Sequence, residues 1–310
     1  MVMKKLLFVY NAKSGKAQVV KYLAQIQDIF TKAGYIVVSY PTQCRDDAKN
    51  IISRIGSNFD RIVCCGGDGT LNEAITGIMR SEWYKEKQIP LGYIPAGSTN
   101  DFATSIRLPK NMVSAARIAV NGRVKSLDMG EFNDRNFVYV ACFGAFSEIS
   151  YSTSQEIKNI LGHQAYVLEA VRKFVPNITK SYRIKAKVKD KKIEGEFIYG
   201  MIRNSNSVGG FKGLAGKDVG LDDGLYEVTL VKPPKTAFDF QEIVSALLMD
   251  KKSNLVYKFK TERIDIVSNE NIDWVVDGEF AGSVKKAKVI NRPGAVKIVT
   301  GENLIYRKND

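Results

Sequence analysis

The stretch CCGGDGTLNEA, residues 64–74, places Asp68 between glycines at the end of an apolar run. Residues 61–65 before it have the composition of a short buried strand. After it, apolar residues recur at the three- and four-residue spacing of an amphipathic helix, at Leu71, Ala74, Ile75, Ile78 and Met79. The stretch therefore predicts a strand–turn–helix joint. Such joints bind phosphates, because free N–H groups and the positive end of the helix face the ligand.

Ordinary turn chemistry explains part of the same stretch. Asp-Gly is a common turn pair, and Thr70 with Glu73 fits the capping-box pattern at a helix start. This explanation does not require three glycines, which give up side-chain packing in exchange for close approach of another group. A carboxylate at an anion site also needs a reason, and a cation between Asp68 and a phosphate would supply one. Alternatively, Asp68 would be the base that activates an acceptor hydroxyl nearby.

Two more glycine turns follow predicted strands in the first third of the chain. NAKSGKA, residues 11–17, follows a strand at 4–10, and PAGSTNDFA, residues 95–103, follows a strand at 91–94. None of the three turns has the GxxxxGK[ST] or the GxGxxG pattern. In a parallel sheet all three would lie at the carboxyl edge, where ligands bind in open α/β folds. The clustering favours a polyphosphate site over three unrelated loops.

Strands and helices alternate in the first third, which predicts an α/β domain with a parallel sheet covered on both faces. The predicted strands are 4–10, 35–40, 61–65 and 91–94, and the predicted helices include 16–33, 46–56 and 112–120. Beyond residue 126, short β patterns dominate, with helices near 164–175 and 238–249. We expect a first domain over 1–126 and a mostly antiparallel β-rich second domain over 127–292. The tail, about 293–310, is expected to return to the first domain.

One hairpin in the second domain can be given a register. YRIKAKVKDKKIEGEF, residues 182–197, alternates apolar and charged residues. A turn at Asp190-Lys191 would pair Lys187 with Glu194 and Lys185 with Glu196. Such cross-strand pairing favours a solvated face over a surface for membrane or nucleic acid.

Composition narrows the possible functions. The chain has 310 residues and a formal net charge of +13, which favours nucleotides, nucleic acid or an anionic membrane as partners. A single histidine, His163, disfavours histidine-rich metal sites and Ser-His-Asp hydrolases, so a general base would be a carboxylate. The four cysteines, at 44, 64, 65 and 142, lack zinc-ligand spacing and are expected to be reduced packing residues. No apolar run reaches the ~18 residues of a membrane span, and we expect a cytoplasmic protein.

Together, GGDGTLNEA, NAKSGK and PAGSTNDFA resemble the diacylglycerol kinase catalytic domain, whose wider group includes sphingosine, ceramide and NAD kinases. FGAFSEISY (143–151), LDDGLYEV (221–228) and DWVVDGEF (273–280) extend the resemblance, which is greatest to the soluble bacterial lipid kinases. It covers nearly the whole chain. It implies ATP-dependent phosphorylation of a lipid hydroxyl by a nucleotide-binding α/β domain and a β-rich domain, with the active site in the cleft between them.

The resemblance also implies roles for individual residues. Asp68 would serve the catalytic Mg²⁺, and Glu279 would be the proton acceptor, with Asp277 beside it as a further catalytic residue. Asp223 would bind a structural Mg²⁺ together with the backbone carbonyls of Gly220 and Leu225. The residues implied to line the ATP site are Asn11, Ser14, Gly15, Thr42, Gly66, Gly67, Asp68, Gly69, Thr70, Leu71, Asn72, Glu73, Gly97, Ser98, Thr99 and Asn100. From the residues alone, LDDG and VDGE are simply turns. The first loop has Asn-Ala where relatives often have Asn-Pro.

Several alternatives remain open at this point. Diacylglycerol is the acceptor that the resemblance favours, but undecaprenol, sphingosine-like lipids and phosphatidylglycerol are alternatives. An NAD kinase-like enzyme and a non-catalytic nucleotide- or membrane-binding module are further hypotheses. The expected partners are ATP and a lipid at the membrane surface, reached by peripheral, electrostatic association with its inner face. We expect no nucleic-acid partner, and a homodimer is an option.

Overall fold

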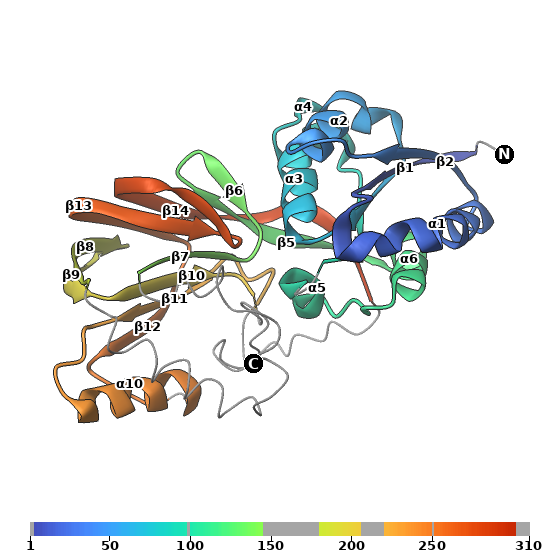
Figure 1. Cartoon of the computed structure of the whole chain (residues 1–310). Coiled ribbons are helices and arrows are strands. Elements are labelled where there is room, and N and C mark those ends of the chain that lie inside the picture. The colour runs from blue at the N-terminus through green and yellow to red at the C-terminus, as the bar shows by residue number, and fades with distance from the viewer. Residues whose placement is uncertain (1–2, 98–99, 145–179, 206–219, 250, 302–310) are drawn as a thin grey trace, which may run out of the picture. The chain divides into compact units, whose positions relative to one another are not determined.

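A computed structural model describes residues 3–97, 100–144, 180–205, 220–249 and 251–301 of the chain (Figure 1). The chain divides into two compact units. The first unit comprises residues 1–130, 204–224 and 292–310, and the second comprises 131–203 and 225–291. Residues 204–224 therefore belong to the first unit, although the sequence analysis assigned them to the second domain. Ser98, Thr99, His163 and the helix expected near 164–175 lie outside the described residues.

The first unit is an α/β structure built on a parallel sheet. Its strands are β1 (Lys4–Tyr10), β2 (Tyr35–Pro41), β3 (Arg61–Gly66) and β4 (Leu91–Pro95), in the order β4-β3-β1-β2. The end of β14 (Glu279–Thr300) pairs in parallel with β4. The helices are α1 (Ser14–Lys32), α2 (Asp47–Ile55), α3 (Asp68–Met79), α4 (Glu82–Lys87), α5 (Asp101–Ser105) and α6 (Met112–Asn121), with a short 3₁₀ turn at Gly56–Asn58. The predicted parallel α/β domain is confirmed.

Helices cover both faces of this sheet, which explains why its strands are apolar throughout. Figure 1 shows α1 and α6 on one face and α2 and α3 on the other. Phe8, Cys65 and Ile94 point into the cluster formed with α1 and α6. Cys64, next to Cys65 on β3, is also fully buried, as expected for neighbours that point to opposite faces.

The second unit is mostly antiparallel β-structure. Its main sheet has the order β12-β11-β10-β7-β13-β14, and the β8–β9 hairpin joins the other half of β13. The strands are β6 (Arg135–Phe137), β7 (Val140–Gly144), β8 (Tyr182–Val188), β9 (Lys191–Phe197), β10 (Tyr199–Arg203), β11 (Tyr226–Val231), β12 (Val256–Thr261), β13 (Arg263–Val276) and the first part of β14. One helix, α10 (Ala237–Met249), packs over an apolar cluster that includes Ile198 and Val231. β5 (Arg123–Phe132) pairs with β6 and β14. The predicted β-rich character is confirmed.

The register predicted for the β8–β9 hairpin is wrong by two residues. The turn lies at Lys189-Asp190, where Lys189 adopts a left-handed conformation with φ of 51°. Lys187 therefore faces Lys192, and Lys185 faces Glu194. A two-residue shift leaves every side chain on the same face, so the apolar alternation could not decide between the registers.

Among the described residues, none of the helices combines the length and the apolar character needed to cross a membrane.

Candidate functional site

The loops that follow β1, β3 and β4 meet at the carboxyl edge of the first unit's sheet. The backbone N–H of Asn11 donates to the carbonyl of Cys65 at 2.9 Å, and that of Ala96 donates to Gly66 at 2.8 Å. Gly15 lies so near the carbonyl oxygen of Ala96 that a Cβ at this position would clash with it. The structure therefore brings the three glycine turns together, as the sequence predicted.

The second strand contributes Thr42 to the same edge. Its N–H donates to the carbonyl of Tyr10 at 2.9 Å, so the residue after β2 lies beside the end of β1. Ser14 is the first residue of α1 and is half-buried.

Asn100 fixes the shape of the loop after β4. Its side-chain oxygen accepts from the N–H of Gly97 at 2.9 Å, and its amide nitrogen donates to the carbonyl of Gly97 at 2.7 Å. Asn100 has a φ of 52°, a conformation that asparagine tolerates better than most residues. The hydroxyl of Tyr93 donates to the carbonyl of Gly66 at 3.1 Å and links this loop to the loop after β3. Ser98 and Thr99, also predicted for the site, lie outside the described residues.

Asp68 is the first residue of α3 and is half-buried. Its Oδ2 accepts a long hydrogen bond, 3.4 Å, from the N–H of Asp101 at the start of α5. Burial raises the pKa of Tyr93, and the negative charge of Asp68 raises it further. The carboxylate thus lies between the loops after β3 and β4, where the sequence placed a metal-binding side chain.

The capping box predicted for Thr70 and Glu73 is wrong. Helix α3 begins three residues earlier than such a box requires, with Gly67 rather than Thr70 at the N-cap. The Glu73 carboxylate instead accepts from the N–H of Asp46 at 2.9 Å and from that of Ala48 at 3.2 Å, at the N-terminus of α2. Partial burial raises the pKa of Glu73, although these two donors act to lower it. Its side chain therefore joins two helices.

The other predicted site residues of α3 differ in how far they are exposed to solvent. The Leu71 side chain is fully buried in the core, so its side chain can contribute only packing. Thr70 is also buried, and the Asn72 side chain accepts from Thr76 at 3.4 Å. Gly69 is exposed at the first turn of the helix.

A buried aspartate that the sequence analysis missed, Asp128 on β5, organises the LDDG turn. Its carboxylate accepts from the N–H of Gly224 at 2.6 Å and from that of Gly294 at 2.8 Å. Its own N–H donates to the carbonyl of Leu221 at 2.8 Å, and its carbonyl accepts from the Asn204 side chain at 3.0 Å. Asp128 is only 1% exposed. A charged residue within the run Leu127-Asp128-Met129 was the available sequence signal.

The turn that Asp128 holds contains the predicted metal ligands Asp223 and Gly220. The Asp223 carboxyl folds back over Gly220, where a Cβ would lie 2.7 Å from its Oδ2. Any side chain larger than that of glycine at position 220 would clash with this carboxyl. A carboxylate above a turn of backbone carbonyls offers the oxygen ligands that Mg²⁺ requires. Leu225, the third predicted ligand, immediately precedes β11. Within the described ranges no cluster of three or more His, Cys, Asp or Glu side chains could hold a metal. Carbonyl and water ligands would therefore have to complete such a site.

In the second unit, Asp277 and Glu279 lie at the tip of the β13–β14 hairpin. The Asp277 carboxylate accepts from the N–H groups of Val138, Tyr139 and Val140 at 2.6, 3.0 and 3.1 Å. The N–H of Asp277 donates to the carbonyl of Val140 at 2.9 Å. Glu279, the first residue of β14, is exposed. The geometry gives Asp277 a structural task and presents Glu279 to the surroundings.

Sequence reasoning also missed a group of charged residues on three neighbouring strands of the second unit, which comprises Arg203, Glu227 and Lys260. Arg203 on β10 faces Glu227 on β11, and Glu227 also contacts Lys260 at 3.1 Å. Burial lowers the pKa of Arg203, and the charge of Glu227 acts in the opposite direction. The charged residues come from three different strands, so no local pattern signals the group.

The chain is similar to known proteins over most of its length. Residues 5–132 match the family described as the diacylglycerol kinase catalytic domain. The chain is 30% identical to a diacylglycerol kinase of Bacillus subtilis (strain 168), over 90% of this chain and 91% of that protein. It is 31% identical to a diacylglycerol kinase of Staphylococcus saprophyticus, over 91% and 90%.

The fold is also similar to solved structures. One crystal structure from Bacillus anthracis str. Sterne aligns with a TM-score of 0.80 at 24% identity, covering 97% of this chain and 98% of that chain. A second, of a diacylglycerol kinase from the same organism, aligns with a TM-score of 0.75 at 21% identity, covering 99% of both chains. At these identities the likeness bears on the fold alone.

Proposed function

The chain belongs to the diacylglycerol kinase family and is a kinase, and from that premise we propose that it transfers the γ-phosphoryl group of ATP to a lipid hydroxyl. Diacylglycerol is the acceptor that we propose, with phosphatidic acid as the product. The observation that carries this proposal is the meeting of three glycine turns around Asp68 at the carboxyl edge of a parallel sheet.

The first unit would hold ATP. The loops after β1, β3 and β4 offer backbone N–H groups and small side chains, which suit a polyphosphate. The predicted lining residues that are at least partly accessible, apart from Glu73, are Asn11, Ser14, Gly15, Thr42, Gly67, Asp68, Gly69, Asn72 and Gly97. Glu73 would act indirectly by fixing α3 against α2, since its carboxylate is engaged there.

Glu279 would act as the general base. As the lipid oxygen forms its bond to the γ-phosphorus, Glu279 takes the hydroxyl proton, and the bond from that phosphorus to the β,γ-bridging oxygen breaks. ADP leaves with the bonding electrons. Asp277 would hold the hairpin that carries Glu279, through its bonds to residues 138–140.

Bound Mg²⁺ would neutralise charge on the phosphates and the transferred group. Asp68 is the residue of this chain proposed to hold it at the nucleotide. Asp223, with the carbonyls of Gly220 and Leu225, is proposed to hold a second, structural ion. The cradle in which the Asp223 carboxyl folds over Gly220 supports this second site.

The lipid acceptor implies work at a membrane surface. We propose peripheral, electrostatic association with the inner face of the membrane, supported by the net charge of +13. Basic groups near anionic lipid contribute about 1 kcal/mol each, and salt screens them.

A substrate panel tests the proposed reaction. The protein is incubated with γ-labelled ATP, Mg²⁺ and vesicles that contain diacylglycerol, undecaprenol, a sphingosine-like lipid or phosphatidylglycerol, with NAD in a parallel reaction. Mass spectrometry of the lipid extracts should find phosphatidic acid as the main labelled product. Label in NADP, in another lipid alone or in no acceptor would contradict the proposal.

A further inference from the structure

We propose that one solvent face of the second unit docks on an anionic lipid bilayer. This face is formed by β9, β8, β13 and β14, and we call it the lysine face after Lys185, Lys187, Lys192, Lys286 and Lys288. The inference rests on the proposed function for its purpose, but it can be tested by binding alone.

Strand pairing places these lysines in two cross-strand rows. In the first row Lys192 faces Lys187, Lys187 faces Asp265, and Asp265 faces Lys288. Each neighbour in the row comes from the next strand, so the row crosses four strands about 4.8 Å apart.

The second row lies two residues further along the same strands. Glu194 faces Lys185, Lys185 faces Val267, and Val267 faces Lys286. Residues two apart on a strand share a face, so both rows present their side chains to the same side. All five lysines of the lysine face are exposed: Lys185 and Lys187 on β8, Lys192 on β9, and Lys286 and Lys288 on β14.

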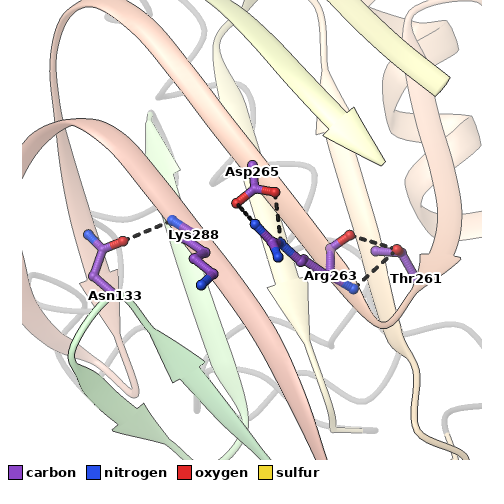
Figure 2. Close-up of polar contacts among 5 residues, drawn as sticks. All are labelled: Asn133, Thr261, Arg263, Asp265 and Lys288. Atoms are coloured by element: carbon purple, nitrogen blue, oxygen red, sulfur yellow. Dashed lines mark hydrogen bonds and ion pairs between the residues drawn. The ribbon is translucent and has the colours of Figure 1, made fainter. Parts of the chain in front are cut away.

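The two carboxylates within these rows, those of Asp265 and Glu194, are already paired with cations. Arg263 forms a bidentate contact with Asp265 through Nε at 2.8 Å and Nη2 at 3.0 Å, as Figure 2 shows. The Glu194 carboxylate is shared by Arg183 at 3.8 Å and Lys185 at 3.5 Å. These acids therefore do not neutralise the remaining lysines.

Four lysines keep their charge available for an external partner. Within the part of the chain that the structure describes, no carboxylate lies within 4.0 Å of Lys187, Lys192, Lys286 or Lys288. Figure 2 shows that Lys288 is held by its backbone, which donates to Asn133 at 2.9 Å, while its side chain extends away from that contact. The strand is thus fixed, and the ammonium group is left to bind elsewhere.

A bilayer fits this arrangement better than a nucleic acid does. Val267 is 42% exposed between Lys185 and Lys286, so the face combines ammonium groups with an apolar side chain at its centre. Single-stranded nucleic acid is usually bound by aromatic side chains that stack on bases. Neither described row contains an aromatic residue. Headgroup phosphates above the acyl boundary match both the cations and the valine.

A charge-reversal pair tests the location of binding separately from net charge. The face variant carries Lys187→Glu, Lys286→Glu and Lys288→Glu. The control carries Lys4→Glu, Lys21→Glu and Lys110→Glu, which are exposed lysines of the first unit. Both variants lose the same formal charge. Co-sedimentation is measured with phosphatidylcholine vesicles with and without phosphatidylglycerol.

The face variant should bind the anionic vesicles at least about tenfold more weakly than wild type, since each lysine near such a surface contributes about fivefold. The control should stay within about threefold of wild type. Equal losses in both variants, or no loss in the face variant, would overturn the proposal. A face variant that loses single-stranded RNA binding but keeps vesicle binding would also overturn it.

Two further measurements distinguish a loss of membrane docking from a loss of folding or of catalysis. If the face variant melts at a lower temperature than wild type, the neutral set Lys187→Gln, Lys286→Gln and Lys288→Gln replaces it and should weaken anionic vesicle binding in the same direction. Phosphorylation of a dispersed short-chain diacylglycerol should be unchanged in the face variant. If wild type does not phosphorylate that lipid, the proposed function fails, while the vesicle result still decides the docking surface.

Discussion

The Asp277 carboxylate accepts a 2.6 Å hydrogen bond from the backbone N–H of Val138, at the entry to β7. Two further N–H groups, of Tyr139 and Val140, donate to the same carboxylate. Asp277 therefore fastens the hairpin tip that carries Glu279 to a neighbouring strand. We therefore propose that Asp277 acts as a positioning residue, a role that differs from the catalytic one implied by the family resemblance.

Removing the Asp277 carboxylate should loosen the hairpin tip. Asp277→Ala should lower the free energy of unfolding by about 1.5–3 kcal/mol, because backbone donors lose a charged acceptor. Asp277→Asn keeps one acceptor oxygen and should lose less. In both variants kcat should fall, while the pH dependence of kcat should keep the wild-type shape. An altered acidic limb in Asp277→Asn, with unchanged melting temperature, would instead assign Asp277 a role in proton transfer.

Removing the Asp128 carboxylate should lower the free energy of unfolding. Asp128→Ala leaves two backbone N–H groups without their carboxylate in a buried setting, which should cost about 3 kcal/mol. Asp128→Asn should cost less, because one acceptor remains. Urea denaturation measures both, and Glu86→Ala, which removes an exposed carboxylate, serves as the control. If Asp128→Ala unfolds at the wild-type urea midpoint, the LDDG turn does not depend on this residue.

A metal held by Asp223 should stabilise the folded chain by mass action. The melting temperature of the wild type should rise with Mg²⁺ in the absence of nucleotide, and Asp223→Ala should lose most of this rise. Asp68→Asn should keep it, since Asp68 is assigned to the nucleotide-bound ion. A Mg²⁺ response that Asp223→Ala fully retains would move the metal site elsewhere.

The cysteines should differ sharply in reactivity. Cys44 is exposed, whereas Cys64, Cys65 and Cys142 are buried, and burial raises the pKa of both Cys65 and Cys142 to about 12. Because the thiolate is the reactive form, these three thiols should stay unmodified at pH 8. A thiol-reactive dye should label Cys44 quickly and the others only in denaturant. Fast labelling that persists in Cys44→Ser would contradict the buried placement.

The parts of the fold set by local pattern could be predicted from the sequence. The apolar run at 61–65 and the helical spacing after it predicted β3 and α3, and the alternation of such elements predicted a parallel sheet. Placing the three glycine turns at one edge followed from that topology alone. The structure confirms these predictions because each of them depends only on neighbouring residues or on the direction of the strands.

Features set by distant contacts could not be predicted in the same way. Glu73 fits a capping box by spacing, but its carboxylate is used by Asp46 and Ala48 of another helix. The hairpin turn at Lys189-Asp190 and the neighbouring alternative have the same apolar alternation, so the local turn conformation decided the register. Asp128 gains its importance from Gly224 and Gly294, which are far from it in sequence.

We propose that Asp68 and Glu279 have different roles in one phosphoryl transfer: Asp68 holds the nucleotide-bound Mg²⁺, and Glu279 takes the proton of the lipid hydroxyl. Asp68 lies at the start of α3 in the first unit, and Glu279 is the first residue of β14, on the hairpin of the second unit. Asp68→Asn keeps the size of the side chain but removes its charge. The concentration of Mg²⁺ needed for half-maximal activity should therefore rise in this variant.

The most direct test is Glu279→Gln, assayed for nucleotide affinity and for turnover on diacylglycerol. The substitution keeps the shape of the side chain and removes the base. Affinity for Mg²⁺-ATP should stay near the wild-type value, while turnover should fall by about 10²–10⁴-fold. A Glu279→Gln enzyme with near-normal turnover would contradict the account, because Glu279 could not then be the group that takes the proton.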